Sequence, residues 1–347
     1  MFMIGAKNVH QMLPEALSLL ELHGVENNSR NGPVTMFPMP ATLCYTKPCE
    51  RVIRWKERDA NPFLHFFECL WMLNGQRDVK FVSQFSSNIA SYSDDGKVFN
   101  AAYGHRWRQW FKTDQILHAI MELKLDMNTR RVYIAMWDAD HDLGAVTKDK
   151  PCNVGLSLQV NHRGELDMVV HNRSNDLIWG ATGANAVHMS FLQEFIARAV
   201  GIPVGRYWQV SSNLHAYKNE LLERVSVLAD LALDPHRTTT TDYYAAEGIE
   251  PYPIMVVQPD IWLQDLGIFM KEGPIIGFRD PFFRQVATPL LRAHQAYRNK
   301  MDPERFEKAE DILEQCRAAD WRLAAIEWVR RRKISSQRAR DDGPVGG

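Results

Sequence analysis

The chain has 347 residues, of which 45% are hydrophobic and 24% are charged, the composition of an ordinary globular protein with a large core. Its 41 Lys and Arg residues nearly balance 42 Asp and Glu residues, which excludes an overall basic field for binding nucleic acid or an anionic membrane. Five cysteines without a framework spacing favour free thiols in a reducing compartment, and without a targeting pattern or a long apolar run we expect a cytosolic protein.

Two amphipathic helices are expected in the first third of the chain. Residues 61–75, NPFLHFFECLWMLNG, repeat apolar side chains at helical steps and end in Asn-Gly, a helix stop signal. Residues 114–125 carry the same pattern. Glu68 lies within the first of these helices. A carboxylate on an apolar helix is costly without a partner, so Glu68 is either an ion-paired structural acid or a functional group.

The middle of the chain predicts paired strands. Residues 132–137, rich in β-branched and aromatic side chains, follow Arg130 and Arg131 directly. Cys152 opens a second strand, CNVGLSLQV, and a turn at residues 161–164 joins it to the strand ELDMVVHNRS. We therefore expect a β-hairpin that begins at Cys152.

After these strands the pattern becomes helical and then fades. Residues 185–200 predict a helix that stops at Gly201, and residues 218–231 predict another. An irregular, proline-containing stretch is expected from there to about residue 290. Because helices and paired strands are interspersed, the fold class is α+β or α/β.

The C-terminal part carries amphipathic helices. Apolar side chains recur at helical steps over residues 303–333, which end in the basic run Arg330 to Lys333. So short a basic cluster is typical of a solvated helix end, with contact to nucleic acid as the alternative. The remaining residues, 334–347, have the composition of a disordered tail.

Four arginines stand in segments that strand pairing could bring near Cys152: Arg30, Arg130, Arg131 and Arg173. A catalytic cysteine needs a thiolate, which positive charge favours, and guanidinium groups also bind phosphate through paired N–H donors. By composition alone each arginine is typical of a surface residue, and Cys152 of an inert buried thiol. The order of the surrounding motifs favours function instead.

Six segments in order resemble the thymidylate synthase family, over roughly residues 15–220. They are FFECLWMLNG, AAYGHRWRQW, NTRRVYIAMWD, PCN, RSNDLIWG and NLHAY. The resemblance implies an α+β fold, a mixed twisted sheet flanked by helices, with the sheets of two subunits packed back to back in a homodimer. It makes residues 1–250 a catalytic domain and residues 251–333 a divergent C-terminal part packed on it, followed by the tail.

The resemblance implies a one-carbon chemistry on a pyrimidine nucleotide. Cys152 is the implied nucleophile, adding to carbon 6 so that carbon 5 can attack the methylene group of 5,10-methylenetetrahydrofolate. Arg173 is implied to lower the pKa of that thiol. Glu68, working through water, and Tyr103 are implied to move protons at the base. The resemblance implies no metal.

The implied binding residues surround that nucleophile. The 5′-phosphate is assigned to Arg30, Arg130, Arg131, Arg173 and Ser174, with the twin arginines reaching across from the other subunit. His215 and Tyr217 are assigned to the sugar 3′-hydroxyl. Asp176 and Trp179 are assigned to the folate, and core packing is an equal alternative for Trp179.

Departures from the family pattern bear on substrate and product. The family reads uracil with the side-chain amide of an asparagine, and strict counting from RSND puts Ala184 at that position. GATGAN, however, has one residue more than the family's interval from Gly to Asn, and the spacing to His215 assigns this role to Asn185. This favours dUMP, although a flipped amide would suit cytosine. Asn153 replaces a family histidine, and Ile89 stands where thymidylate synthases cover the folate-side intermediate with a tryptophan. The chain also ends DDGPVGG, without an apolar cap, so we expect water rather than hydride to reach the intermediate.

We therefore expect a folate-dependent dUMP 5-hydroxymethyltransferase, of the kind some viruses use for modified DNA precursors, in the host cytoplasm. A dCMP or CMP hydroxymethylase and a true thymidylate synthase are the alternatives within this chemistry. A non-catalytic nucleotide- or RNA-binding relative is the alternative outside it. The expected partners are a pyrimidine nucleoside monophosphate, folate and a second copy of the chain, with no membrane, metal or nucleic acid.

Overall fold

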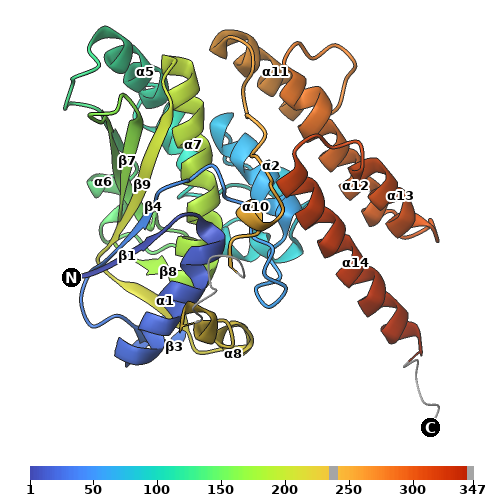
Figure 1. The fold of residues 1–347 in the computed structure, drawn as a ribbon. Helices are drawn as coiled ribbons and strands as arrows, with labels where there is room; N and C mark the ends of the chain where they lie inside the picture. The colour runs from blue at the N-terminus through green and yellow to red at the C-terminus, as the bar shows by residue number, and fades with distance from the viewer. Residues whose placement is uncertain (234–240, 342–347) are drawn as a thin grey trace.

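A six-stranded mixed sheet forms the centre of the computed structural model, which describes residues 1–233 and 241–341 (Figure 1). In spatial order its strands are β1 (Phe2–Ala6), β4 (Ala41–Tyr45), β9 (Val204–Ser211), β7 (Leu166–Asn172), β6 (Asn153–Val160) and β5 (Tyr133–Ala135). β1 runs parallel to β4 and β7 parallel to β9, whereas the other neighbours are antiparallel. The α+β class and the mixed sheet are as expected.

A second, smaller sheet carries several of the expected site residues. Its strands are, in order, β2 (Val25–Ser29), β3 (Gly32–Met36), β10 (Leu214–Tyr217) and β8 (Asn175–Asp176). β10 runs parallel to β8, so His215 stands opposite Asp176. Arg30 lies in the turn between β2 and β3. The small sheet thus collects residues that are far apart in sequence.

Helices cover one face of the main sheet. α7 (Asn185–Val200) packs between the strands β7 and β9 on one side and α2 (Pro62–Leu73) on the other (Figure 1). α5 (Gln115–Leu125) contacts α7, and α1 (Val9–His23) contacts β1 and β4. The helices predicted around Glu68, before the middle strands and after residue 185 are therefore confirmed.

Local capping and turn chemistry explain where these elements begin and end. Asn61 caps α2, because its Oδ1 accepts hydrogen bonds from the backbone N–H groups of Phe63 and Leu64. Gly201 ends α7, as predicted. Both middle strands are present as β5 and β6, and the predicted turn joins β6 to β7 as an antiparallel hairpin.

Shorter elements of the described chain connect the main ones. They are α3 (Val79–Val82), η1 (Ser87–Tyr92), α4 (Tyr103–His105), η2 (Arg106–Trp110), α6 (Ala139–Asp142), η3 (Leu177–Ala184), α8 (Glu220–Ser226), η4 (Ala229–Leu233), α10 (Tyr243–Ala246) and η5 (Phe283–Ala287). α4 lies against α2: a Cβ at Gly104 would stand 1.9 Å from the carbonyl oxygen of Met72, so this approach requires glycine. The helix predicted over 218–231 is divided between α8 and η4.

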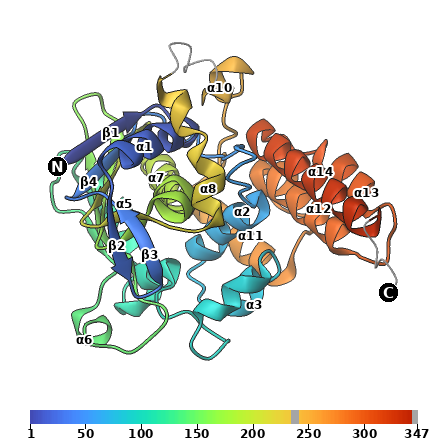
Figure 2. The same cartoon turned by 90° about the horizontal axis from the view of Figure 1, so that it is seen from below.

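The C-terminal helices gather beside the main body (Figures 1 and 2). They are α11 (Pro259–Glu272), α12 (Thr288–Arg298), α13 (Arg305–Leu313) and α14 (Ala319–Asp341), and α11, α12 and α14 contact α2. The expectation of an irregular stretch up to about residue 290 is wrong, because it contains α11. Pro259 and Pro289 stand in the first turns of α11 and α12, where proline starts a helix instead of interrupting one.

The end of α14 also differs from the expectation. The helix includes residues 334–341, which were expected to be disordered, because Gln, Arg and Ala there are good helix formers. The rest of the expected tail, 342–347, lies outside the described residues. In the basic run, Arg331 and Arg332 both pair with Asp59, which supports a helix end rather than a nucleic-acid contact. Among the described helices, none has the length and apolar character needed to cross a membrane.

Candidate active site

Cys152 stands directly before β6 and lines a cavity of about 620 Å³, named here the Cys152 cavity. Residues from separate strands and turns, all assigned to the nucleotide by the sequence, line it as well: Arg30, Arg173, Ser174, His215 and Tyr217. The fold therefore brings most of the expected nucleotide-binding set around the expected nucleophile.

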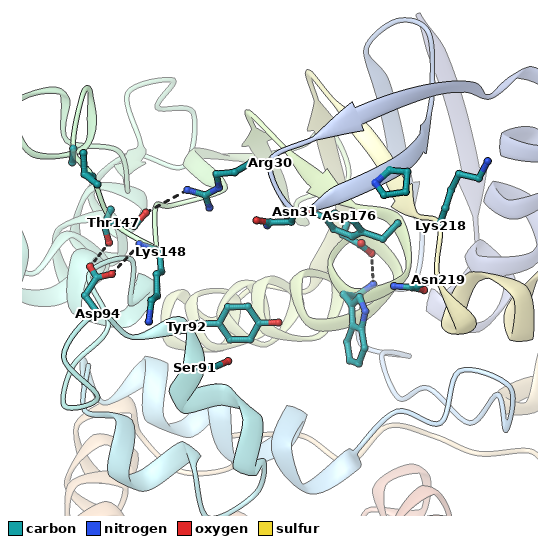
Figure 3. Close-up of a pocket in the computed structure, with 15 residues that line it drawn as sticks. Arg30, Asn31, Ser91, Tyr92, Asp94, Thr147, Lys148, Asp176, Lys218 and Asn219 are labelled. Carbon is teal, nitrogen blue, oxygen red and sulfur yellow. Dashed lines mark hydrogen bonds between the residues drawn. The ribbon is translucent and has the colours of Figure 1, made fainter.

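A second cavity, of about 1160 Å³, adjoins the first (Figure 3). Asp176 and Trp179 line this Asp176 cavity, together with Ser91 and Asn219. The wall shared by the two cavities consists of Arg30, Asn31, Tyr92, Lys148 and Tyr217. A ligand in one cavity is therefore within reach of a ligand in the other.

Arg173 holds the segment that carries the thiol. Its Nε donates to the carbonyl oxygen of Pro151 at 2.8 Å, and its Nη2 lies 4.0 Å from Sγ of Cys152. Burial raises the pKa of the Cys152 thiol above its ordinary value, and the charges of Arg173 and Arg30 oppose this shift. Arg173 thus favours the thiolate, but burial is the larger effect.

Tyr103 contacts the backbone at the nucleophile. Its hydroxyl oxygen accepts hydrogen bonds from the N–H groups of Cys152 and Asn153, each at 3.2 Å. Burial raises the pKa of Tyr103, so the hydroxyl keeps its proton. With both oxygen lone pairs engaged, the remaining capacity of this hydroxyl is to donate.

Four buried amides behind Cys152 form a directed chain. Nδ2 of Asn153 donates to Oδ1 of Asn185 at 3.1 Å, and Nδ2 of Asn185 donates to Oδ1 of Asn175 at 2.9 Å. Nδ2 of Asn175 donates to Oε1 of Gln209 at 2.8 Å, and Nε2 of Gln209 donates to the carbonyl oxygen of Ala181 at 2.7 Å. Because a carbonyl oxygen can only accept, this last contact orients every amide in the chain. The four side chains are named the amide relay.

Gly180 leaves room for the amide relay. A Cβ at this position would stand 2.6 Å from Oδ1 of Asn175 and 3.0 Å from Nδ2 of Asn185. The additional residue in GATGAN lies in η3, where the backbone kinks because Thr182 and Gly183 leave helical geometry. Asn185, and not Ala184, contributes its side chain to the relay.

Glu68 lines neither cavity and lies on α2, facing α7. Its Oε2 is 3.4 Å from Nε2 of His188, and no Lys or Arg of the described chain forms an ion pair with it. Burial raises the pKa of Glu68 to about 7 and lowers the pKa of His188 to about 3. A carboxyl group with this pKa exchanges its proton near neutral pH, which is the behaviour of a general acid or base.

Asp176 and Trp179 meet at the start of η3. Oδ1 of Asp176 accepts hydrogen bonds from the backbone N–H groups of Ile178 at 2.8 Å and Trp179 at 2.6 Å, which leaves Oδ2 for a ligand (Figure 3). Trp179 is 55% exposed, which excludes core packing. The guanidinium of Arg58 lies 4.3 Å from the centre of its ring, on the protein side, and burial lowers the pKa of Arg58 to about 10.

Comparison with known proteins agrees with this geometry. The thymidylate synthase family profile matches residues 23–240. The chain belongs to the thymidylate synthase family. The deoxyuridylate hydroxymethyltransferase of Pseudomonas phage M6 is 52% identical, with 99% of each chain covered. Proteins of the same name from Bacillus phage SP01 and Delftia phage PhiW-14 are 36% and 31% identical over 72% and 58% of this chain and 67% and 58% of their own lengths.

Four residues that the resemblance assigned to ligands line neither site cavity of this thymidylate synthase relative: Asn185, which lies in the amide relay behind Cys152, and Arg130, Arg131 and Ile89. Arg130 and Arg131 are exposed and line neither the Cys152 cavity nor the Asp176 cavity. Arg131 lines a separate cavity of about 400 Å³ beside α5. Ile89 packs against the core, whereas Tyr92 of the same helix, η1, lines both site cavities.

The sequence did not identify several residues at the site, among them Tyr92, Lys148, Arg58 and His188. Lys148 has a sequence signal, since TKDKPCN places two lysines just before the nucleophile. His188 has a weaker signal: it stands three residues after Asn185, on the same face of one helix. Arg58 and Tyr92 have none, because their partners are remote in sequence. No group of His, Cys, Asp or Glu side chains in residues 1–233 and 241–341 is arranged to hold a metal ion.

Proposed function

We propose that this member of the thymidylate synthase family is a deoxyuridylate hydroxymethyltransferase, which converts dUMP to 5-hydroxymethyl-dUMP. The observation that carries the proposal is the pair of adjoining cavities, with Cys152 in one and Asp176 and Trp179 in the other. The 52% identity to the phage M6 enzyme over nearly the whole chain supports the same substrate and product. A nucleotide and a folate would meet at the shared wall.

The nucleotide would bind in the Cys152 cavity. Arg30, Arg173 and Ser174 would hold the phosphate, since guanidinium forks and a hydroxyl suit its oxygens. His215 and Tyr217 line the same cavity and would meet the sugar hydroxyl. Nδ1 of His215 already contacts Oδ1 of Asn213 at 2.8 Å, which leaves Nε2 for the ligand.

The thiolate of Cys152 would add to carbon 6 of uracil, which moves negative charge onto the carbonyl oxygen at carbon 4. Nδ2 of Asn185 has one N–H beyond its relay contact and could donate to that oxygen, while Oδ1 could accept from N3–H. Arg173 would stabilise the thiolate. Tyr103 would assist removal of the proton at carbon 5, and Glu68, working through water, would move protons at the base.

The Asp176 cavity offers groups that fit a folate. 5,10-Methylenetetrahydrofolate, when bound, supplies the methylene group that becomes attached to carbon 5. Oδ2 of Asp176 would accept hydrogen bonds from the N–H groups of a pterin ring. The exposed face of Trp179, whose electron-rich ring is held by Arg58, would stack on that ring.

The shared wall supports a hydroxymethyl product. Its side chains are polar: Arg30, Asn31 and Lys148 stand beside the hydroxyl groups of Tyr92 and Tyr217. Such a wall admits water to the methylene carbon, whereas transfer of hydride requires water to be excluded there. Addition of water to that carbon gives the hydroxymethyl group.

We also propose that the enzyme is a homodimer in the cytoplasm of a phage-infected host. On the face of the main sheet opposite α7, Val169, His171 and Trp208 are half-buried, and Tyr133 is exposed. A second copy packed on this face would cover them. The twin arginines at the start of β5 could then reach the partner's Cys152 cavity.

The experiment incubates the purified chain with 5,10-methylenetetrahydrofolate and dUMP, dCMP or CMP, and weighs the product nucleotide by mass spectrometry. We expect 5-hydroxymethyl-dUMP from dUMP and no product from a Cys152→Ala variant. A methylated product would identify a thymidylate synthase, and a hydroxymethylated cytosine nucleotide would identify the other substrate class. Tight binding of dUMP with retention of tritium at carbon 5 would indicate a non-catalytic relative.

A further inference from the structure

The buried His188 and the half-buried Glu68 form an isolated polar pair between α7 and α2. His188 is 4% exposed on α7, and its Nε2 lies 3.4 Å from Oε2 of Glu68 on α2. Within the described chain, Nε2 of His188 has no hydrogen bond, and Glu68 has no hydrogen bond or ion pair with any other residue. The two groups are therefore each other's nearest polar partners. Their separation of 3.4 Å is slightly longer than a hydrogen bond, as is common for catalytic contacts before substrate binds.

The surroundings keep the imidazole neutral. The ring of His65, one turn before Glu68 on α2, lies with its centre 6.2 Å from that of His188, and Arg58 stands near His65. Burial lowers the pKa of His188 to about 3, so its imidazole is uncharged at neutral pH. A neutral imidazole can donate to a carboxylate through N–H or accept from a carboxylic acid, so it serves Glu68 in either protonation state.

α7 links this pair to the base-reading amide. Asn185 and His188 are separated by three residues, so they lie on the same side of the helix, and the amide relay fixes the orientation of Asn185. The helix that would hold the pyrimidine edge is the one that holds the imidazole against Glu68. Both groups are placed by one rigid element, as accurate proton transfer requires.

We propose that His188 is a positioning residue that holds the carboxyl group of Glu68 for the attack of water on the methylene carbon, a role that rests on the proposed function. Glu68 takes a proton as the water oxygen bonds to that carbon, and the electron pair of the exocyclic double bond moves to the oxygen on carbon 4. Return of that pair forms the double bond between carbons 5 and 6 and expels the thiolate of Cys152. The proton on Glu68 then passes to solvent, so the step is a net hydration.

The test compares two substitutions of His188 in the full chain. His188→Leu fills the volume without a polar atom, and His188→Gln restores an N–H and a carbonyl oxygen at similar reach. In single turnovers with carbon-5-tritiated dUMP, tritium release reports the earlier steps, and 5-hydroxymethyl-dUMP reports the attack of water. We expect His188→Leu to slow product formation about 10- to 100-fold relative to tritium release, with unchanged dUMP affinity, and His188→Gln to recover most of the rate.

A matched control is His294→Leu, which replaces another buried histidine, on α12, whose ring packs against Phe63 and Phe85. It should leave the ratio of the two rates unchanged. Equal slowing of tritium release and product formation in His188→Leu, or failure of His188→Gln to recover the rate, would overturn the role of His188. If the unmodified chain releases tritium but forms a methylated nucleotide, the proposed function fails instead, and the two failures are distinct.

Discussion

Glu68, whose proposed role is to move protons at the base, lies in an environment that is unfavourable for its charged form. Burial raises its pKa from 4.5 to about 7, so the folded chain holds this proton more tightly than the unfolded chain. The contribution of Glu68 to stability is full below about pH 4.5 and is lost as the pH rises through about 7. At pH 8 the fold therefore contains a half-buried carboxylate whose neighbour is a neutral imidazole.

The first prediction concerns Glu68→Gln, which removes this titration. The variant should lose hydroxymethyl formation, and its free energy of unfolding relative to the unmodified chain should increase by up to ~3 kcal/mol between pH 4.5 and pH 8, since 2.5 pKa units correspond to this energy. Denaturant titrations of both proteins at the two pH values measure this difference. Glu250→Gln, an exposed change, serves as the control and should show no such pH dependence. Equal differences at both pH values would contradict the prediction.

At the scale of elements, the amide relay fixes the orientation of Asn185, the residue proposed to read the base. A flipped Asn185 would place Nδ2 against Nδ2 of Asn153 and Oδ1 against Oδ1 of Asn175, two repulsive contacts. The carbonyl oxygen of Ala181 prevents the whole relay from reversing. The sequence left open whether the amide could turn to suit cytosine, and these contacts oppose that turn.

The second prediction follows from the relay. Asn153→Ala removes the donor that holds Oδ1 of Asn185, so the ratio of kcat/KM for dUMP to that for dCMP should fall about 10-fold, the effect of about one hydrogen bond. Steady-state kinetics with both nucleotides measure it. Ser211→Ala is the matched control, because Asn175 keeps its contact with Gln209 when the Ser211 hydroxyl is lost. A similar fall of this kcat/KM ratio in both variants would show that the amide relay does not set the preference for dUMP over dCMP.

Elements whose signal is local in sequence were predicted well, and those that depend on distant partners were not. The helical period of residues 61–75 and the Gly201 stop of α7 are encoded in short segments, and the structure confirms both. The kinked segment η3 was not predicted, because a kink formed by two non-helical residues has no periodic signal. α11 was missed because its segment was expected to be an irregular, proline-containing stretch, although Pro259 in the first turn begins the helix.

At the scale of the whole molecule, six short motifs were sufficient to predict the family and most of the cavity around Cys152. Each motif is a short run of neighbouring residues, so it could be recognised in the sequence without knowing the fold. The contacts of His188 and Arg58 could not be predicted, since they depend on how α2 and α7 pack and on a turn more than a hundred residues away. The near-neutral net charge is consistent with a free mononucleotide substrate, met by a few arginines at one cavity.

The third prediction concerns the assembly, because Arg130 and Arg131 line neither site cavity of their own chain. If they complete the phosphate site of a second copy, an Arg130→Ala, Arg131→Ala double variant and a Cys152→Ala variant should each be inactive alone. When the two variants are mixed and exchange subunits, about half of the dimers contain one chain of each kind, and each such dimer has one intact site out of two. The mixture should therefore recover about a quarter of the activity of the unmodified enzyme. Assays after mixing, with native mass spectrometry to count the mixed dimers, measure this recovery.

The matched control for that experiment is Arg163→Ala, an exposed arginine in the β6–β7 turn that pairs with Glu165 on the same hairpin. It should keep full activity alone, since a surface ion pair contributes little. Full activity of the double arginine variant would show that Arg130 and Arg131 do not bind the phosphate. Mixed dimers without recovered activity would show that the arginines serve the site of their own chain. In that case, a dimer that covers the exposed face of the main sheet would contain active sites that are each built from a single chain.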